Sequence, residues 1–209
     1  MNVAGYLEAN AAEIGYLAWQ HLLLFFLSLA AAVVLGVSLG VAVAKLRLVE
    51  AVAVPIMNVL QACPEIVLLA VSIPLLGIGF EGALIPLFVK GILPILRNTS
   101  SGIASVDRRL VEAARGLGLT SVQILIRIEL PAALPIIISG VRIAAVMLIS
   151  VLTLTAYIGV ESLGTLIVRG IARMDTDPLI AGSLLTAILA LAVNYLLVSA
   201  ERTAARYAM

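Results

Sequence analysis

Long apolar runs separated by short polar segments dominate this chain of 209 residues. An α-helix needs roughly 20 apolar residues to cross about 30 Å of hydrocarbon, and five runs reach that length. They are predicted as membrane-spanning helices at about residues 19–44, 49–76, 83–103, 132–158 and 178–199. The second run contains Pro55, Pro64 and Pro74, so its helix is predicted to bend or break. The pattern predicts an all-α integral membrane protein, because no alternating segments of about ten residues favour transmembrane strands.

The amino-acid composition points to the same environment, the lipid bilayer. Hydrophobic residues make up 63% of the chain and charged residues 12%, far outside the usual range of soluble globular domains. A net charge of +1 gives no reason to expect nucleic acid as a partner. We expect a single transmembrane domain over residues 1–209, because no repeat or linker divides the sequence.

Residue types that metal sites and hydrolases require are scarce. The chain has one cysteine, Cys63, and one histidine, His21, whereas a zinc site needs about three or four protein ligands. A serine and histidine dyad would have to be built at His21, and the sequence has no GxSxG motif. It also has no GxxxxGK[ST] phosphate loop. We therefore expect neither a metal site nor an enzymatic activity in this chain.

Basic residues gather on one side of the predicted spans. That side holds Lys45, Arg47, Arg97, Arg108, Arg109, Arg115, Arg127, Arg202 and Arg206. The other side holds Arg169 and Arg173. Because short cytoplasmic loops carry an excess of Lys and Arg, the C-terminus is predicted to be cytoplasmic and the N-terminus outside. The polar segment between the third and fourth spans is also predicted to be cytoplasmic.

One charged, amphipathic segment interrupts the apolar pattern at about residues 105–131. Asp107 is placed to cap a short helix there. Spacing i, i+3, i+4 and i+7 puts four apolar positions on one face of this helix: Leu110, Ala113, Ala114 and Leu117. Gly118 permits a left-handed turn, and Thr120 with Gln123 forms a capping-box pattern for a second helix that continues into the next span. A push on the first helix would therefore be passed into the membrane.

The segment EAARGLGLTSVQILIRIELP, residues 112–131, resembles the signature cytoplasmic loop of permease subunits in binding-protein-dependent ABC importers. Its matching positions are Glu112, Ala113, Ala114, Gly118, Ile128, Leu130 and Pro131. The segments PLLGIGFEGALIPLF, PILRNTSSGIASVD and YIGVESLGTLIVRGIA are similar to the glycine betaine, carnitine and choline branch of these permeases. The resemblance covers about residues 20–200 and implies a type I importer permease fold, with a coupling helix between the third and fourth spans. An ordinary interfacial amphipathic helix is the alternative interpretation of the loop alone.

The resemblance also implies partners and cargo. An extracellular solute-binding protein would deliver a small quaternary-ammonium osmoprotectant such as glycine betaine, choline or carnitine. This chain and a second permease subunit, identical or related, would form the pathway in a bacterial or archaeal plasma membrane. Two cytoplasmic ATPase subunits would hold ATP and magnesium, so no cofactor is expected here. The positions expected to contact the ATPase are Glu112, Ala113, Ala114, Arg115 and Gly118.

Two other functions are weighed against this interpretation. The first is an importer of the same kind whose cargo is an amino acid or a betaine-like metabolite, because the coupling loop is shared by many cargo classes. The second is a self-contained channel or secondary transporter. Such proteins often carry inverted repeats with paired broken helices, and no second half of this sequence repeats the proline-rich region of residues 49–103.

Polar side chains inside the predicted spans form a second group of candidates. A charge in hydrocarbon costs roughly 3 kcal/mol or more unless it is paired or hydrated. Glu65 and Lys90 lie at depths that a lysine side chain can bridge, so one interpretation is a compensating ion pair. The other is that Glu65, next to Pro64, faces the pathway and attracts a cationic substrate. Asn58 and Tyr157 are candidates for hydrogen bonds between spans or for lining the pathway.

Overall fold

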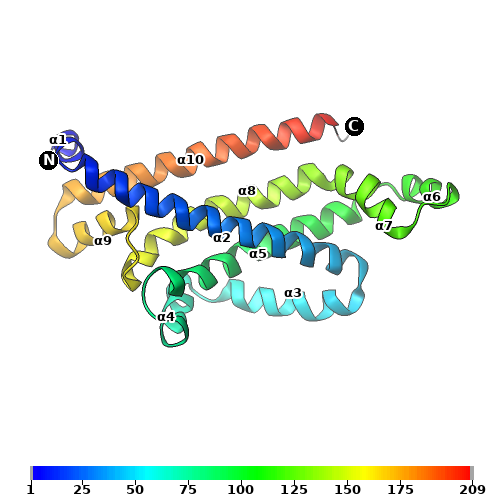
Figure 1. Ribbon diagram of the computed structural model, residues 1–209, viewed down its shortest axis with the longest axis horizontal. Helices are drawn as coiled ribbons and strands as arrows, with labels where there is room; N and C mark the ends of the chain where they lie inside the picture. Colours follow the sequence, from blue (N-terminus) through cyan, green and yellow to red (C-terminus); the bar gives the residue numbers. More distant parts are fainter. Residues whose placement is uncertain (1, 208–209) are drawn as a thin grey trace.

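The computed structural model describes residues 2–207, and its elements there are helices (Figure 1). Their bounds are α1 Val3–Ala9, α2 Ala11–Lys45, α3 Arg47–Ala62, α4 Glu65–Leu76, α5 Phe80–Ala104, α6 Arg108–Gly116, α7 Ser121–Ile124, the π-helix η1 Leu125–Glu129, α8 Leu130–Leu154, the 3-10 helix η2 Thr155–Ile158, α9 Leu163–Arg173 and α10 Thr176–Tyr207. The predicted all-helical class is confirmed.

Four long helices, α2, α5, α8 and α10, run along the long axis of the molecule (Figure 1). Helix α5 packs against both α2 and α8, and α10 packs against α8 and α9. The largest buried cluster joins side chains from α2, α4, α5, α8 and η2, and it includes Leu24, Phe25, Leu69, Leu87 and Leu148. The two termini lie at opposite ends of the bundle, with α1 and α9 at one end and α6 and α7 at the other (Figure 1).

The contact between α2 and α5 depends on small residues. A Cβ atom added to Gly36 would lie 2.8 Å from the Cβ of Ile95, and one added to Gly40 would lie 2.5 Å from the Cβ of Thr99. Any larger residue at these two positions would push the helices apart. Such close approach is the usual way in which membrane helices gain van der Waals contact, since lipid removes the hydrophobic driving force between them.

Within residues 2–207, length and composition identify three helical segments that can cross a membrane: Ala11–Lys45, Ser121–Ile158 and Thr176–Arg206. The bent pair α3 and α4 makes a fourth candidate. Helix α5 is long enough, with 25 residues, but Glu81, Lys90 and Arg97 interrupt its apolar sequence. The count of five is therefore not established by these criteria.

The predicted break in the second span lies at Cys63 and Pro64, where α3 and α4 meet at an angle of 102°. Cys63 adopts the extended conformation with φ −63° and ψ 131°, which is typical of a residue before proline. Pro55 and Pro74 lie inside α3 and α4. Of the three prolines, Pro64 thus marks the place where the helix stops.

Candidate functional site

The amphipathic segment forms the short helix α6, which projects from one end of the bundle (Figure 1). The carboxylate of Asp107 accepts a hydrogen bond of 2.8 Å from the backbone N–H of Arg109, as its predicted role as a cap requires. Beyond the helix, Gly118 has a φ of +83°, and the N–H of Leu119 donates to the carbonyl of Ala114 at 3.1 Å. Gly118 fixes this reversal of the chain because glycine adopts positive φ without a Cβ clash.

Most of the surface of α6 is open to a partner. The exposed residues include Leu110, Glu112, Ala113, Arg115, Leu117 and Gly118. Leu117 is 81% exposed, whereas Ala114 is only 4% exposed. The four apolar positions that were predicted to share one face of α6 therefore differ in exposure. Ala114 is buried, whereas Leu110, Ala113 and Leu117 are exposed. Of the two alanines expected to contact a partner, only Ala113 is accessible in this conformation.

The connection from α6 to the bundle is continuous and helical. The N–H of Thr120 donates to Oε1 of Gln123 at 2.8 Å, and the N–H of Gln123 donates to Oγ1 of Thr120 at 3.3 Å, so the predicted capping box is confirmed. From Ser121 the chain runs through α7, η1 and α8 to Ile158 as one helical segment of 38 residues. A displacement of α6 at Gly118 therefore acts on the end of a long helix.

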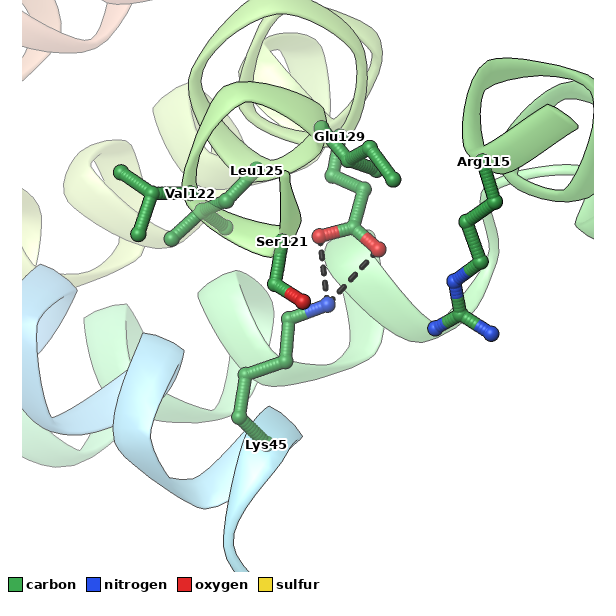
Figure 2. Close-up of a pocket in the computed structure, with 7 residues that line it drawn as sticks. Lys45, Arg115, Ser121, Val122, Leu125 and Glu129 are labelled. Carbon is green, nitrogen blue, oxygen red and sulfur yellow. Dashed lines mark hydrogen bonds and ion pairs between the residues drawn. The ribbon is translucent and has the colours of Figure 1, made fainter. Parts of the chain in front are cut away.

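An ion pair that the sequence analysis missed ties this segment to α2 (Figure 2). The Nζ atom of Lys45, the last residue of α2, lies 2.7 Å from Oε1 of Glu129 in η1. The Glu129 side chain is 7% exposed and that of Lys45 is 41% exposed. Arg115 lines the same cavity of about 360 Å³. The sequence did contain a sign of this ion pair. Glu129 stands between the apolar residues Ile128 and Leu130, and a charge that is buried among apolar residues needs a partner.

Replacing Lys45 by Met is expected to lower the free energy of unfolding by about 2 kcal/mol, because Glu129 would be left buried without its ion-pair partner. Thermal unfolding in detergent measures this loss. The double variant Lys45→Met with Glu129→Met should recover most of it, since an apolar pair of similar volume leaves no buried charge. A Lys45→Met variant as stable as the native chain would contradict the assigned burial of Glu129.

The two predicted intramembrane charges meet where α3 gives way to α4. The Nζ atom of Lys90 lies 3.5 Å from Oε1 of Glu65, as the pairing interpretation expects. Asn58 in α3 accepts a hydrogen bond from the guanidinium of Arg97 in α5. Tyr157 lies in η2 and is 54% exposed. The first two contacts tie the broken span to α5.

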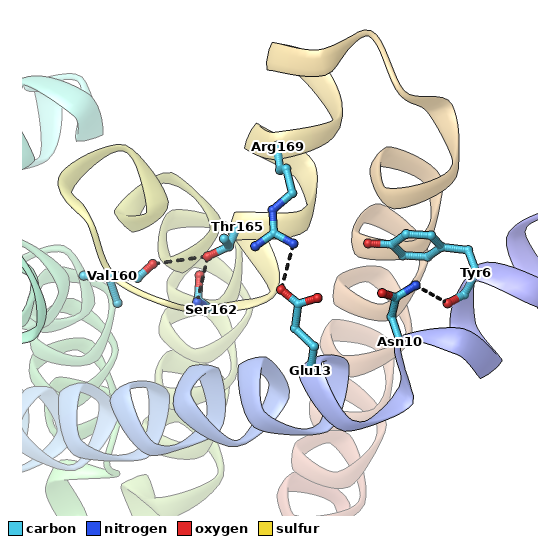
Figure 3. A network of polar contacts seen from close by, with 7 residues as sticks. All are labelled: Tyr6, Asn10, Glu13, Val160, Ser162, Thr165 and Arg169. Carbon is cyan, nitrogen blue, oxygen red and sulfur yellow. Dashed lines mark hydrogen bonds and ion pairs between the residues drawn. The ribbon is translucent and has the colours of Figure 1, made fainter.

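At the opposite end of the bundle, a network of polar contacts ties α9 to α2 (Figure 3). Arg169 donates from its guanidinium to Oε1 of Glu13 in α2 at 2.7 Å, and this hydrogen bond raises the pKa of Arg169 above its usual value. Ser162 caps α9, because its Oγ accepts from the N–H of Gly164 at 3.2 Å while its own N–H donates to Thr165. The charge of Arg169 is therefore fixed, and α9 is capped at its start by Ser162 and tied to α2 by Arg169 in its second half.

Comparison with known sequences identifies relatives over almost the whole chain. The family described as "Binding-protein-dependent transport system inner membrane component" matches residues 32–205. The choline transport system permease protein OpuBB of Bacillus subtilis is 34% identical, with 96% of this chain and 93% of the relative covered. The osmoprotectant import permease protein OsmW of Salmonella typhimurium is 37% identical, with 94% of each chain covered. The carnitine transport permease protein OpuCB of Listeria monocytogenes is 36% identical, with 93% and 89% covered.

Comparison with solved structures identifies the same architecture. An inward-facing MetNI methionine ABC transporter contains a chain that superposes with a TM-score of 0.86 at 23% identity, covering 94% of this chain and 98% of that one. An amino acid ABC transporter solved with histidines gives a TM-score of 0.79 at 19% identity, with 95% and 97% covered. These likenesses establish the fold. Together with the family match, they show that the chain belongs to the inner membrane components of binding-protein-dependent transport systems, the permease subunits of ABC importers.

Proposed function

We propose that this chain forms the translocation pathway of an ATP-driven importer for small quaternary-ammonium osmoprotectants such as glycine betaine, choline or carnitine. The observation that carries the proposal is the similarity over nearly the full length to permeases named for choline, carnitine and osmoprotectants, at 34% to 37% identity. The exposed helix α6 supports the coupling half of the proposal, because it offers a protruding surface at one end of the bundle.

The proposed topology has five spans, with α3 and α4 counted as one broken span and α5 as the third. Helix α5 packs between α2 and α8, so it is expected to cross the membrane beside them. Its buried charge, Lys90, has oxygen partners, which reduces the cost of placing it in hydrocarbon. The excess of basic residues at the end that carries α6 supports a cytoplasmic location for α6 and the C-terminus, with the N-terminus outside a bacterial or archaeal plasma membrane.

The proposed assembly contains two copies of a permease, either this chain twice or this chain with a relative. Two cytoplasmic ATPase subunits hold ATP and magnesium, and an external solute-binding protein delivers cargo. This chain itself catalyses no reaction. The contacts with the ATPase are made by Glu112, Ala113, Arg115 and Gly118, whereas Ala114 is buried and faces away from that partner.

Coupling follows from the route by which α6 joins the spans. Closure of the ATPase dimer around ATP moves α6, and Gly118 passes the movement to the continuous segment of α7, η1 and α8. The ion pair between Lys45 and Glu129 carries the same movement to the end of α2. The bundle then changes between inward-open and outward-open states, and each ligand shifts that equilibrium by its different affinity for the two states.

The cargo is tested on the solute-binding protein that copurifies with the transporter. Betaines, choline, carnitine and ordinary amino acids are titrated into it by isothermal calorimetry. The proposal expects micromolar or tighter dissociation constants for a quaternary ammonium compound. Binding of an ordinary amino acid or of a betaine-like metabolite alone would still support an ATP-driven importer but would contradict the proposed quaternary-ammonium cargo.

A further inference from the structure

The break between α3 and α4 exposes the backbone carbonyls at the end of α3, and a lysine from α5 fills the gap. The Nζ atom of Lys90 donates to the carbonyl oxygen of Gln61 at 2.9 Å and to that of Cys63 at 2.6 Å. The last carbonyls of a helix lack partners inside the helix and carry partial negative charge. Lys90, whose side chain is 1% exposed, therefore donates two of its three N–H groups to these backbone carbonyls.

Glu65 is held only loosely by this lysine. Its Oε1 lies 3.5 Å from Nζ, which is beyond the range of about 2.7–3.2 Å for an N–H···O hydrogen bond. The Glu65 side chain is 38% exposed. The carboxylate therefore keeps a free side and can meet a second cation there.

That free side opens into a cavity of about 350 Å³ between α4 and α8. Its other lining residues come from α8: Val146, Met147, Ser150, Val151 and Leu154. The one hydroxyl, on Ser150, donates to the carbonyl of Val146 in its own helix at 3.4 Å. The cavity thus offers one carboxylate surrounded by apolar walls.

The cavity lies far from both ends of the bundle. Lys90 follows Phe80, the first residue of α5, by ten positions, which is about 15 Å along a helix. Glu65 lies beside Lys90 and is therefore at a similar depth. A partly exposed carboxylate at this depth cannot face lipid without a large penalty, so a water-filled pathway is its natural surrounding.

The chemistry of the walls selects the type of cation. A calcium or magnesium ion requires about six or more oxygen ligands, water included, zinc requires about four ligands, and a primary ammonium requires several hydrogen-bond acceptors. A quaternary ammonium group has no N–H donors and spreads its charge over methyl groups. One carboxylate with aliphatic and thioether contacts satisfies such a group, since methionine packs around irregular apolar shapes.

We propose that Glu65 and the walls of this cavity form a transient subsite for the quaternary ammonium group of the cargo. Lys90 is the positioning residue, because it holds the break that points Glu65 into the cavity. Its nearby positive charge also keeps the subsite weak, which suits a pathway that must release its cargo. This inference rests on the proposed function and adds the place in this chain where the cargo's charge is recognised.

The first experiment measures modification of a single cysteine in the cavity and does not depend on transport. Ser150→Cys is introduced into the complete transporter with Cys63, the chain's one cysteine, changed to Ser. Two methanethiosulfonate reagents of similar size are compared, one with a trimethylammonium group and one with a sulfonate. Because a cysteine thiolate is itself an anion and favours the cationic reagent, each rate is divided by the rate of the same reagent with a free thiol in solution. We expect the normalised rate of the cationic reagent to be about tenfold the higher, because the carboxylate attracts it, and choline should slow its reaction. The Glu65→Gln variant in the same background should make the two normalised rates equal.

The second experiment compares cargoes in proteoliposomes that contain the transporter, its ATPase subunits and the solute-binding protein. Glu65→Gln should lower the maximal uptake rate of choline about tenfold and that of glycine betaine less, because betaine carries its own carboxylate. The matched variant Glu81→Gln, at an exposed position in the first turn of α5, should leave both rates unchanged. Equal normalised rates for the two reagents in the presence of Glu65, or equal losses of uptake for both cargoes, would overturn the subsite. Native ATP-driven uptake would still support the importer.

Discussion

Replacing Leu117 by Asp is expected to detach the ATPase subunits and to reduce ATP-driven uptake by at least about tenfold. Leu117 is 81% exposed at the end of α6 and is apolar, like the exposed Leu110. If this surface lies in a cleft on an ATPase, the new carboxylate would be buried at the interface, which costs several kcal/mol against about 1.4 kcal/mol per tenfold in affinity. Copurification of the ATPase with a tagged permease measures the loss.

A charge change elsewhere at the same end of the molecule provides the control. Arg202 is exposed near the C-terminus, so Arg202→Glu should keep both the ATPase and the uptake. Neither substitution removes a buried contact of the permease, and both variants should reach native yield. Retention of the ATPase by Leu117→Asp at native uptake would show that α6 is not the docking helix.

The second large effect is expected from Gly164→Ala at the start of α9. A Cβ atom there would lie 2.1 Å from the carbonyl oxygen of Thr153 and 2.6 Å from its Cα. These are backbone atoms, which cannot move aside by changing a rotamer. The chain is therefore expected to lose about 3 kcal/mol of stability and most of its folded yield, since overpacking of this kind displaces whole elements. Size-exclusion chromatography and thermal unfolding in detergent measure both quantities.

Gly15→Ala is the matched control for this substitution. Gly15 lies in α2, and a Cβ atom there has no neighbour within 4 Å. The change should raise stability by about 0.5–1 kcal/mol, because alanine loses less conformational freedom in a helix than glycine. Native behaviour of Gly164→Ala would mean that α9 does not pack against the end of α8 as described.

Local sequence rules predicted the helical elements well and the angles between them poorly. The run at 49–76 was expected to bend or break, and Pro64 supplies the local reason for its break. The angle of 102° depends on Lys90, which lies 27 positions from Cys63 and stabilises the exposed carbonyls. Helix α9 lies between the fourth and fifth predicted spans and was not predicted as a helix, because its polar anchors, such as Glu13, lie far away in sequence.

The same distinction applies to the candidate site. Asp107, Thr120 and Gln123 act within three residues of their partners, so spacing alone identified these caps. Lys45 and Glu129 are 84 positions apart, and no helical periodicity relates them. The burial of Ala114 was missed for a different reason, since the helical spacing placed it on one face with Leu110, whereas α6 contacts the α7 and η1 helices that follow the turn at Gly118.

The most direct test of the central claim is uptake into proteoliposomes that contain this permease, its partner permease and the ATPase subunits. ATP is enclosed inside, and the solute-binding protein with labelled choline or glycine betaine is added outside. We expect the cargo to accumulate against a concentration gradient only when both ATP and the solute-binding protein are present. Equally fast uptake without ATP and without the solute-binding protein, ending at equal concentrations on both sides, would identify a self-contained channel and contradict an ATP-driven importer.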